Sequence, residues 1–263
     1  MSSWVKLPIA CCLVLVANAE EQVRCPPIPG AERLWARPAL RFVLVGEMHG
    51  TNETPAVFAD LVCSAGETKR AVIAAVEFRD QEALDRFLDS KNAEISVKEL
   101  LSKDEWKGID GRASRAMVAM LERLRSLKAQ HLVSRVIAFS ASGESAAQDE
   151  EVMASALLRA SAHNPDAVVI VLAGNFHVAK KELAEVGSYR PMGSFLPPAQ
   201  TVSLLVTDRG GDAWNCQDGS CGPHTVKSSG GVIRGITLVS PHAGYDGVLS
   251  TGLAATASKP ASR

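Results

Sequence analysis

The chain has 263 residues, a formal net charge of −1, 46% apolar residues and 22% charged residues. This balance excludes a disordered chain and a membrane bundle, and it allows one large domain or two small ones with a sizeable core. Because the net charge is near zero and no Lys/Arg-rich tract occurs, the electrostatic footprint of a nucleic-acid-binding protein is missing. We therefore expect no nucleic-acid partner.

The first residues have the pattern of a cleaved export signal. Lys6 precedes an apolar run from Leu7 to Val16, and Ala17-Asn18-Ala19 has the small-x-small form of a signal-peptidase site. The apolar run is about half of the ~20 residues that a spanning helix needs, which disfavours an uncleaved anchor. We predict a signal peptide over residues 1–19, an exported mature chain, periplasmic or secreted, and no stable membrane insertion after cleavage.

Export gives the cysteines a structural meaning. Two of the six cysteines would leave with the signal, and an even number in an oxidising compartment favours disulfides. Cys216 and Cys221 close a short loop that contains glycine, so we pair them, and elimination then pairs Cys25 with Cys63. A structural zinc site is a poorer reading, because no Cys-x-x-Cys pair or nearby histidine spacing supports it.

Short apolar runs along the chain predict buried strands. Residues 20–40 come first and read as an extended N-terminal strap. The predicted strands are Arg41–Gly46, Ala71–Glu77, Val133–Phe139, Ala167–Ala173, Thr201–Thr207, Val232–Val239 and Gly247–Ser250.

Helical patterns separate the first strands. Thr54 is a predicted cap for a helix that ends near Gly66, and apolar stripes predict further helices between Gln81 and Ala129. A helix over Asp149–Ala162 and a short one over Val178–Val186 follow, and the small, polar segment 251–263 reads as a flexible tail. Strands that alternate with helices imply parallel pairing. We expect a single α/β domain over residues 41–250, with a mostly parallel central sheet flanked by helices.

Two Gly-x-x-His segments occupy equivalent places, each at the end of a buried strand. Gly46 to His49 follows the first strand and Gly174 to His177 follows the fourth. Glu47 and Glu77 emerge at the same predicted edge, and ligands of open α/β sheets bind at the carboxyl ends of the strands. We predict a joint catalytic site built from these two glutamates and two histidines.

Two chemistries fit such a set. In the first, His49, Glu77 and His177 hold a divalent ion, Zn, Mn or Fe, while Glu47 orients a ligand or acts as general base. In the second, no metal is bound and a His paired with a Glu activates water directly. Hydrolysis is the simplest use of either arrangement.

Two loops hold further candidates for substrate binding. Asp110 and Arg112 lie in a turn between predicted helices, where a plain turn is the alternative reading. Tyr245 and Asp246 lie in a late loop that could reach the cleft. A small molecule or a peptide is the expected substrate class.

These motifs resemble a known superfamily. The segment from Gly46 to Glu53 is similar to the Gly-Glu-x-His opening of the superfamily that joins erythromycin esterase-like enzymes, ChaN-like haem-binding proteins and Tiki/TraB proteins. The segment from Ala173 to Val178 is similar to its second Gly-x-x-His motif, and Glu77 matches the acidic residue that ends its second strand. The resemblance spans Arg41 to His177.

The resemblance implies different functions for different subfamilies. Tiki-like proteases use two His and a Glu with a metal, which would correspond to His49, His177 and Glu77. Erythromycin esterase-like members activate water with the His after the first Gly-Glu, which corresponds to His49. ChaN-like members bind haem, with a further His in the first motif, but Thr54-Pro55-Ala56 stands in that region here. Haem could use another ligand, and the low aromatic content disfavours a large haem pocket unless a homodimer supplies one from both subunits.

The function that best fits these residues is an exported hydrolase of the erythromycin esterase/Tiki type, of the esterase or peptidase class. Its alternative is a ChaN-like protein that binds haem or another iron compound.

Overall fold

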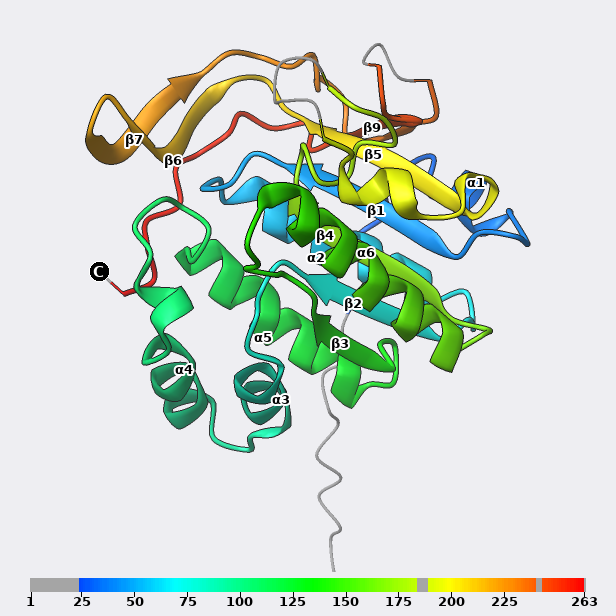
Figure 1. The fold of residues 1–263 in the computed structure, drawn as a ribbon, viewed down its shortest axis with the longest axis horizontal. Helices are drawn as coiled ribbons and strands as arrows, with labels where there is room; N and C mark the ends of the chain where they lie inside the picture. The colour runs from blue at the N-terminus through cyan, green and yellow to red at the C-terminus, as the bar shows by residue number, and fades with distance from the viewer. Residues whose placement is uncertain (1–23, 184–188, 240–242, 263) are drawn as a thin grey trace, which may run out of the picture.

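The computed structural model of the chain describes residues 24–183, 189–239 and 243–262 (Figure 1). The predicted signal peptide, residues 1–19, therefore lies outside the described residues. Seven strands form a central sheet in the order β3-β2-β4-β1-β5-β9-β8. They are β1 (Phe42–Glu47), β2 (Val72–Val76), β3 (Arg135–Ala138), β4 (Val168–Gly174), β5 (Thr201–Thr207), β8 (Gly235–Thr237) and β9 (Gly247–Ser250).

Parallel pairing dominates this sheet. The neighbours from β3 to β9 pair parallel, and only the edge strand β8 runs antiparallel, against β9. The predicted α/β domain with a mostly parallel sheet is thus confirmed. The strand predicted over Val232–Val239 shrinks to the three residues of β8.

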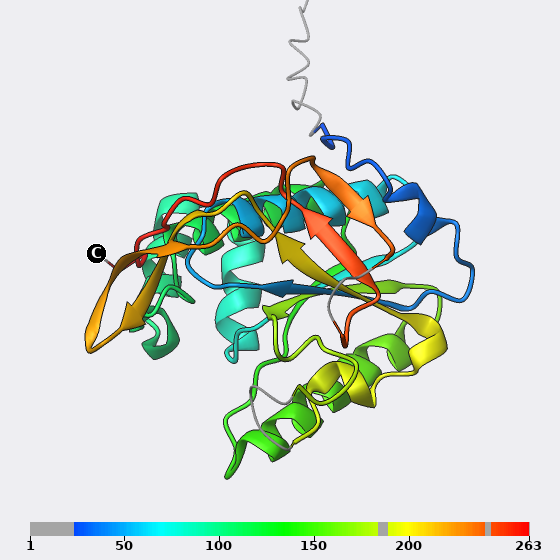
Figure 2. The ribbon, with the colours of Figure 1, turned by 90° about the horizontal axis from the view of Figure 1, so that it is seen from above.

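Helices cover both faces of the sheet (Figure 2). One face packs against α2 (Glu53–Gly66), α3 (Gln81–Asp89), α4 (Ala93–Leu101) and α5 (Arg115–Ala129), and the other against α6 (Ala146–His163). Side chains of β1 alternate between the two cores: Val43 and Val45 enter the first, Phe42 and Leu44 the second. Burial on both faces explains why β1 is an unbroken apolar run.

Short helical segments lie in the connections. They are α1 (Glu32–Trp35) in the N-terminal strap, and the 3-10 turns η1 (Asp104–Lys107), η2 (Met192–Phe195) and η3 (Pro198–Gln200). The strap is therefore not extended throughout. Its helix α1 places Leu34 fully buried in the first core.

Two predicted helix features differ from the structure. The cap predicted at Thr54 does not form: α2 begins at Glu53 after Asn52, and the buried Thr54 hydroxyl accepts a hydrogen bond from Thr51 at 3.0 Å. After β4, residues 178–183 are not helical, and residues 184–186 of the predicted helix lie outside the described residues. The Val178 carbonyl accepts a hydrogen bond from Ser203 Oγ on β5 at 2.6 Å, so it is used in a tertiary contact and not in a helical ladder.

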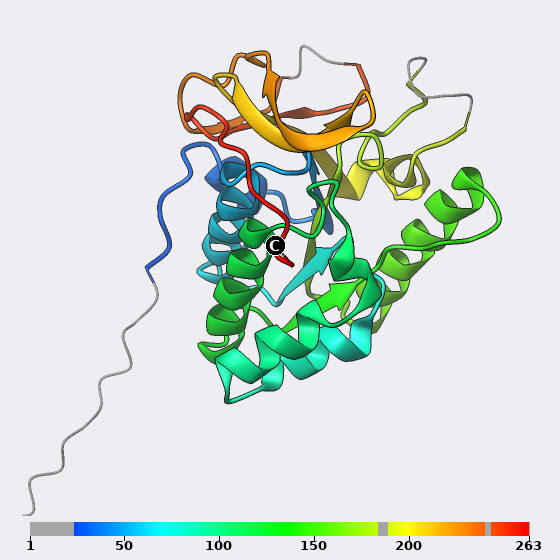
Figure 3. The same ribbon diagram turned by 90° about the vertical axis from the view of Figure 1, so that its left-hand side faces the viewer.

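A β-hairpin that the sequence analysis does not anticipate follows β5. It consists of β6 (Gly211–Gln217) and β7 (Ser220–Val226), which form a separate two-stranded sheet. Its strands are largely polar, so they lack the apolar runs that reveal the central strands. Figure 3 shows the hairpin along one edge of the molecule.

Both predicted disulfides form. Cys216 and Cys221 face each other across the end of the hairpin, and Cys25 joins the N-terminal strap to Cys63 of α2. Two disulfides favour an oxidising compartment. Within the described residues, none of the helices combines the length and the apolar composition that crossing a bilayer requires.

The C-terminal segment is ordered where the sequence predicts fraying. Ser258 N donates to the Gly50 carbonyl at 2.8 Å, and Ala261 N donates to the Ala113 carbonyl at 2.9 Å. The side chain of Glu53 accepts hydrogen bonds from the backbone and the hydroxyl of Thr256. The segment therefore joins the loop after β1 to the start of α5.

Candidate active site

Four predicted site residues converge at the carboxyl edge of three adjacent strands. Glu47 is the last residue of β1, Glu77 follows β2 directly, and His177 follows β4, which lies between them. The register pairs Glu47 with Gly174 across β1 and β4. The predicted proximity of His49 and His177, which are far apart in sequence, is thus a product of strand order.

The Glu77 carboxylate lies between the two imidazoles. Its Oε2 is 3.9 Å from Nε2 of His49, and its Oε1 is 3.8 Å from Nε2 of His177. Oε2 also accepts a hydrogen bond from the Gly174 backbone N–H at 2.7 Å, which fixes the carboxylate across the end of β4. Both ring nitrogens therefore face one nearly buried carboxylate.

A second carboxylate contacts Nδ1 of each imidazole. His49 Nδ1 lies 3.0 Å from Glu47 Oε1, and His177 Nδ1 lies 2.6 Å from Glu150 Oε1. The side chains of Glu47 and Glu150 are each only 2% exposed. The second Glu150 oxygen accepts the Met192 N–H at 2.7 Å. A buried acceptor at Nδ1 keeps the proton there in the neutral ring, so Nε2 carries the free lone pair.

These carboxylates raise the pKa of both histidines. Burial of His49 lowers its pKa, but attraction to Glu47, the hydrogen bond to Glu47 and attraction to Glu77 together raise it above the ordinary 6.5. Burial of His177 likewise lowers its pKa, and the hydrogen bond to Glu150 with attraction to Glu77 and Glu150 more than offsets this.

Gly174 lies close to both histidine rings. A Cβ at this position would lie 3.2 Å from His49 Nε2 and 3.3 Å from His177 Cδ2. Such a methyl group would crowd the space between the rings. The first residue of the second Gly-x-x-His motif therefore keeps the space between the imidazoles open.

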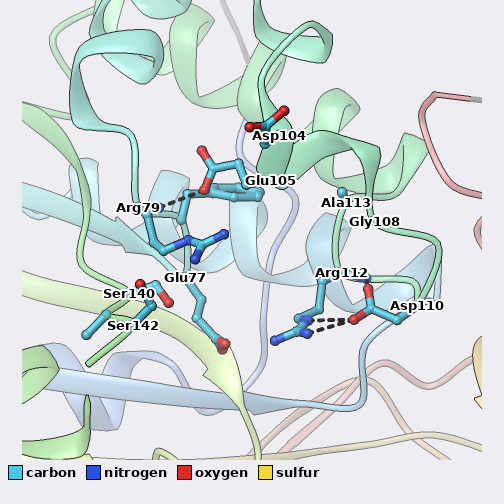
Figure 4. Close-up of a pocket in the computed structure, with 12 residues that line it drawn as sticks. Glu77, Arg79, Asp104, Glu105, Gly108, Asp110, Arg112, Ala113, Ser140 and Ser142 are labelled. Atoms are coloured by element: carbon cyan, nitrogen blue, oxygen red, sulfur yellow. Dashed lines mark hydrogen bonds and ion pairs between the residues drawn. The ribbon is translucent and has the colours of Figure 1, made fainter. Parts of the chain in front are cut away.

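Two cavities adjoin this cluster. One, of about 340 Å³, is lined by Glu47, Met48, His49, Asp110, Gly174, Asn175, Phe176, His177 and Asn215. The other, of about 390 Å³, extends from Glu77 past Phe78 to Ser140 and Ser142 on one side and to η1 on the other (Figure 4). Their sizes fall at the small end of the range for ligand sites.

The second cavity contains Arg112 and Asp110, two of the predicted substrate-binding residues. The Arg112 guanidinium donates two hydrogen bonds to the Asp110 carboxylate, at 2.9 and 2.7 Å. Figure 4 shows Arg112, Arg79 and Glu77 extending into the same open space. Among the described residues, the Arg79 guanidinium has no hydrogen-bond or ion-pair partner, and the sequence analysis did not single it out.

Tyr245 and Asp246, the other predicted substrate-binding residues, line neither cavity. The Tyr245 hydroxyl donates to the Asn175 carbonyl at 2.9 Å. The Asp246 carboxylate binds Lys180 Nζ at 2.9 Å and the Ser203 N–H at 2.9 Å. These contacts make Asp246 a link between β5 and the turn after β4.

Glu150 is the site residue that sequence reasoning missed. It lies within the acidic run Asp149-Glu150-Glu151 near the start of α6, which reads as a solvated face. A signal was present, because Glu150, Met153 and Leu157 follow a helical spacing and all three are buried. An acidic residue in the apolar stripe of a helix requires a buried partner.

The chemistry of the predicted metal ligands, His49, Glu77 and His177, suits a divalent ion. Imidazole and carboxylate donors suit Zn, Mn or Fe. Yet among the described residues, no three His, Cys, Asp or Glu side chains form a group that could hold an ion.

Comparison with known proteins identifies the fold. No protein-family model matches the chain, and no curated protein sequence matches it. A variant of the erythromycin esterase EreC, in its open conformation, superimposes with a TM-score of 0.62 at 13% identity over 88% of this chain and 89% of that one. A Bacillus cereus protein gives 0.58 at 13% identity, covering 87% and 91%. A succinoglycan biosynthesis protein gives 0.55 at 13%, covering 75% and 73%. At such low identity these matches show that the chain has a fold like that of erythromycin esterase.

Proposed function

We propose that this protein is a hydrolase in which a histidine, oriented by a buried carboxylate, activates water. The observation that carries the proposal is the pair of imidazoles, each with Nδ1 on its own buried carboxylate and Nε2 directed at Glu77. This is the arrangement of a general base oriented by a carboxylate.

The two histidines divide the work of the reaction. Neutral His49 accepts a proton from water at Nε2 as the water oxygen bonds to the carbonyl carbon of an ester or amide. His177, protonated and attracted to Glu77 and Glu150, then donates its Nε2 proton to the leaving oxygen or nitrogen as that bond breaks. The His49 proton returns to His177 through solvent. The carboxylates raise the pKa of both histidines, which favours the protonated form that His177 needs as an acid.

The resemblance to erythromycin esterases supports the hydrolytic reading. The fold is like that of an erythromycin esterase, and the motifs at Gly46 and Gly174 resemble those of the superfamily that also contains the Tiki-like proteases. We propose membership of this superfamily, with an ester or amide bond as target.

The cavity beside Glu77 would take the larger part of the substrate. Arg112 and Asp110 border it, so a substrate group there meets a guanidinium already oriented by its carboxylate partner. The Arg79 guanidinium lies in the same cavity. We propose a polar small molecule or a peptide end as the substrate.

A metal-dependent variant of this function is the second candidate. One observation favours this variant. Both Nε2 atoms face the Glu77 carboxylate, and carboxylates hold both Nδ1 atoms. Metal-ligating histidines often have their second ring nitrogen on a carboxylate in this way. Metal analysis of the protein purified without chelator tests it: one equivalent of Zn, Mn or Fe, lost in both His49→Ala and His177→Ala, would establish this variant. Stoichiometric haem uptake with a Soret band would instead support the ChaN-like alternative.

We also propose that the protein works outside the cytoplasm. The two disulfides and the signal-like sequence over residues 1–19 support export.

Hydrolysis of p-nitrophenyl acetate by the purified mature chain tests the main proposal. We expect His49→Ala and His177→Ala each to lower kcat/KM by about 10²-fold or more. The control is His163→Ala, an exposed histidine at the end of α6 whose ring contacts the Arg159 carbonyl. Rates equal to wild type in both site variants, with folding intact by circular dichroism, would contradict the proposal.

A further inference from the structure

The hairpin β6–β7 lies against the loops that carry the site. Trp214 N donates to the Gly50 carbonyl at 2.8 Å, and Trp214 Nε1 donates to the Ile109 carbonyl at 3.0 Å. In Figure 2 the hairpin lies on the side toward which the arrow of β1 points. The backbone of Trp214 thus ties the hairpin to the loop of His49, and its side chain ties it to the loop of Asp110.

The approach of hairpin and loop is close enough to require glycine. Gly50 has φ +84°, and a Cβ there would lie 1.9 Å from the Trp214 carbonyl oxygen. No side chain fits between β6 and the loop that follows His49. The position of β6 relative to the imidazoles is therefore set by backbone contact.

Alternate residues of β6 point to opposite sides. Trp214 and Cys216 both approach the Ile109 carbonyl, Cys216 with its sulfur at 3.9 Å. Asn215, between them, lines the cavity of about 340 Å³ that also contains His49 and His177. The hairpin therefore contributes an amide side chain to the wall of the catalytic cavity.

The Asn215 amide has no partner among the described residues. Its Oδ1 is buried without a hydrogen bond, and no described group binds its nitrogen. The two amide atoms can exchange places by rotation, so the side chain can present either a donor or an acceptor to the cavity. A buried polar atom without a partner is costly. Because Asn215 lines the cavity beside the two imidazoles, rotation of its side chain would turn a polar atom of the amide to a ligand there.

The disulfide adjoins this residue. Cys216 follows Asn215 and pairs with Cys221 directly across the hairpin. An isolated two-stranded hairpin is marginally stable in water, and β6–β7 forms a sheet of its own. The cross-link closes the hairpin next to the residue that faces the cavity.

From these contacts we infer that Asn215 is a substrate-binding residue: its amide N–H donates to the carbonyl oxygen of the ester or amide positioned over His49 and His177, and the Cys216–Cys221 disulfide holds it there. This inference rests on the proposed hydrolytic function. In the bound substrate, the scissile carbonyl oxygen would then point toward the hairpin. It also makes activity sensitive to reduction of this disulfide.

A binding measurement separates this inference from the hydrolytic proposal. The probe is p-nitrophenyl methylphosphonate, a stable anion whose tetrahedral centre imitates an attacked carbonyl, titrated calorimetrically into the full mature chain. We expect Asn215→Ala to weaken its binding about tenfold, the loss of one hydrogen bond. The matched control is Gln217→Ala, which removes an amide two residues along the same strand and side, at an exposed position that lines neither cavity. We expect its affinity to stay within about twofold of wild type.

The disulfide is tested in the same assay. The double variant Cys216→Ser with Cys221→Ser should lose affinity to the level of Asn215→Ala while its circular dichroism spectrum stays that of wild type. Wild-type binding that Asn215→Ala leaves unchanged would overturn the inference, and so would absence of probe binding by wild type at millimolar concentration. If the phosphonate binds through Asn215 but p-nitrophenyl acetate is not hydrolysed, the inference stands as ligand recognition and the hydrolytic proposal fails.

Discussion

At the scale of single residues, buried carboxylates orient both histidine rings and raise their pKa values. Each ring has one nitrogen on a buried carboxylate and the other at Glu77. Attraction to Glu77 contributes to the raised pKa of both rings. The pH dependence of activity and of stability should therefore follow the titration of His49 and His177.

The raised pKa values predict the direction of the pH profile. A general base must be neutral and a general acid protonated, so kcat/KM should rise with pH through an apparent pKa above the ordinary histidine value of 6.5 and fall again at higher pH as His177 loses its proton. Glu47→Gln removes the main attraction that raises the His49 pKa, so we expect the acidic limb to move to lower pH while the maximal rate falls. The pH profile of p-nitrophenyl acetate hydrolysis by wild type and Glu47→Gln provides the measurement, and NMR titration of the imidazole protons assigns the limb to a histidine. An unmoved limb in Glu47→Gln would show that His49 is not the base.

The same shifts affect stability with a definite sign. A histidine whose pKa is higher in the folded state than in the unfolded state stabilises the fold fully below the unfolded value. That contribution is lost as pH rises through the folded value. His49 and His177 should therefore stabilise the fold below pH 6.5 and lose this contribution at higher pH. This trend opposes activity, because the neutral base that hydrolysis requires is the less stabilising form.

Glu150 is predicted to act through His177. Glu150→Gln keeps the size of the side chain but removes the charge that holds the ring, and we expect kcat to fall by about 10²-fold or more. Glu151→Gln is the matched control, since Glu151 is the exposed neighbour on the same helix. A structural role alone would lower the melting temperature and leave the His177 pKa in place. A lowered His177 pKa in Glu150→Gln, measured by NMR, identifies a positioning role.

At the scale of elements, the C-terminal segment and the loop after β1 depend on each other. Residues 255–261 hydrogen-bond Gly50, Asn52, Ala113 and Arg115 through the backbone, and Ser258 is buried. This segment reads as a tail because it is small and polar, and such a sequence has no apolar pattern to indicate where it packs. Hydrogen bonds between its backbone and the backbone of the loop after β1 and the start of α5 fix the position of the segment.

Removal of residues 251–263 should therefore destabilise the site. We expect the free energy of unfolding to fall by about 2–4 kcal/mol, because several part-buried backbone groups lose their partners. Chemical denaturation gives the measurement. Removal of residues 262 and 263 alone is the control, because no hydrogen bond of the described residues involves Ser262. Equal stability of the two truncated chains would mean that the contacts contribute nothing.

At the scale of the whole molecule, the two disulfides are expected to differ in effect. The Cys25–Cys63 bond closes a loop of 38 residues and joins the strap to α2, whereas Cys216 and Cys221 are 5 residues apart. Chain entropy predicts a loss of about 4 kcal/mol for Cys25→Ala with Cys63→Ala, and about 2 kcal/mol for the same change at the hairpin. Urea denaturation compares the two double variants. A hairpin variant that is the less stable of the two would contradict this account.

The sequence by itself determined the sheet and the ends of its strands. Apolar runs mark β1, β2, β4 and β5 because strands buried on both faces must be apolar along their length. Residues that directly follow such strands gather at one edge, so the grouping of Glu47, His49, Glu77 and His177 could be predicted before their distances were known. The disulfide pairs followed from a short loop and elimination.

Only the tertiary structure decided what surrounds these residues. Glu150 reaches His177 from a helix, Asn215 reaches the cavity from a polar hairpin, and the C-terminal segment binds the loop after His49. Tyr245 and Asp246 bind backbone and Lys180 outside the cavities, although their loop suggested a substrate role. Such contacts join polar groups far apart in the chain, and a polar group has no periodic pattern that reveals its partner. The local periodicity of apolar residues predicts which side chains are buried. The partner of a hydrogen bond depends on how distant parts of the chain meet in the folded structure.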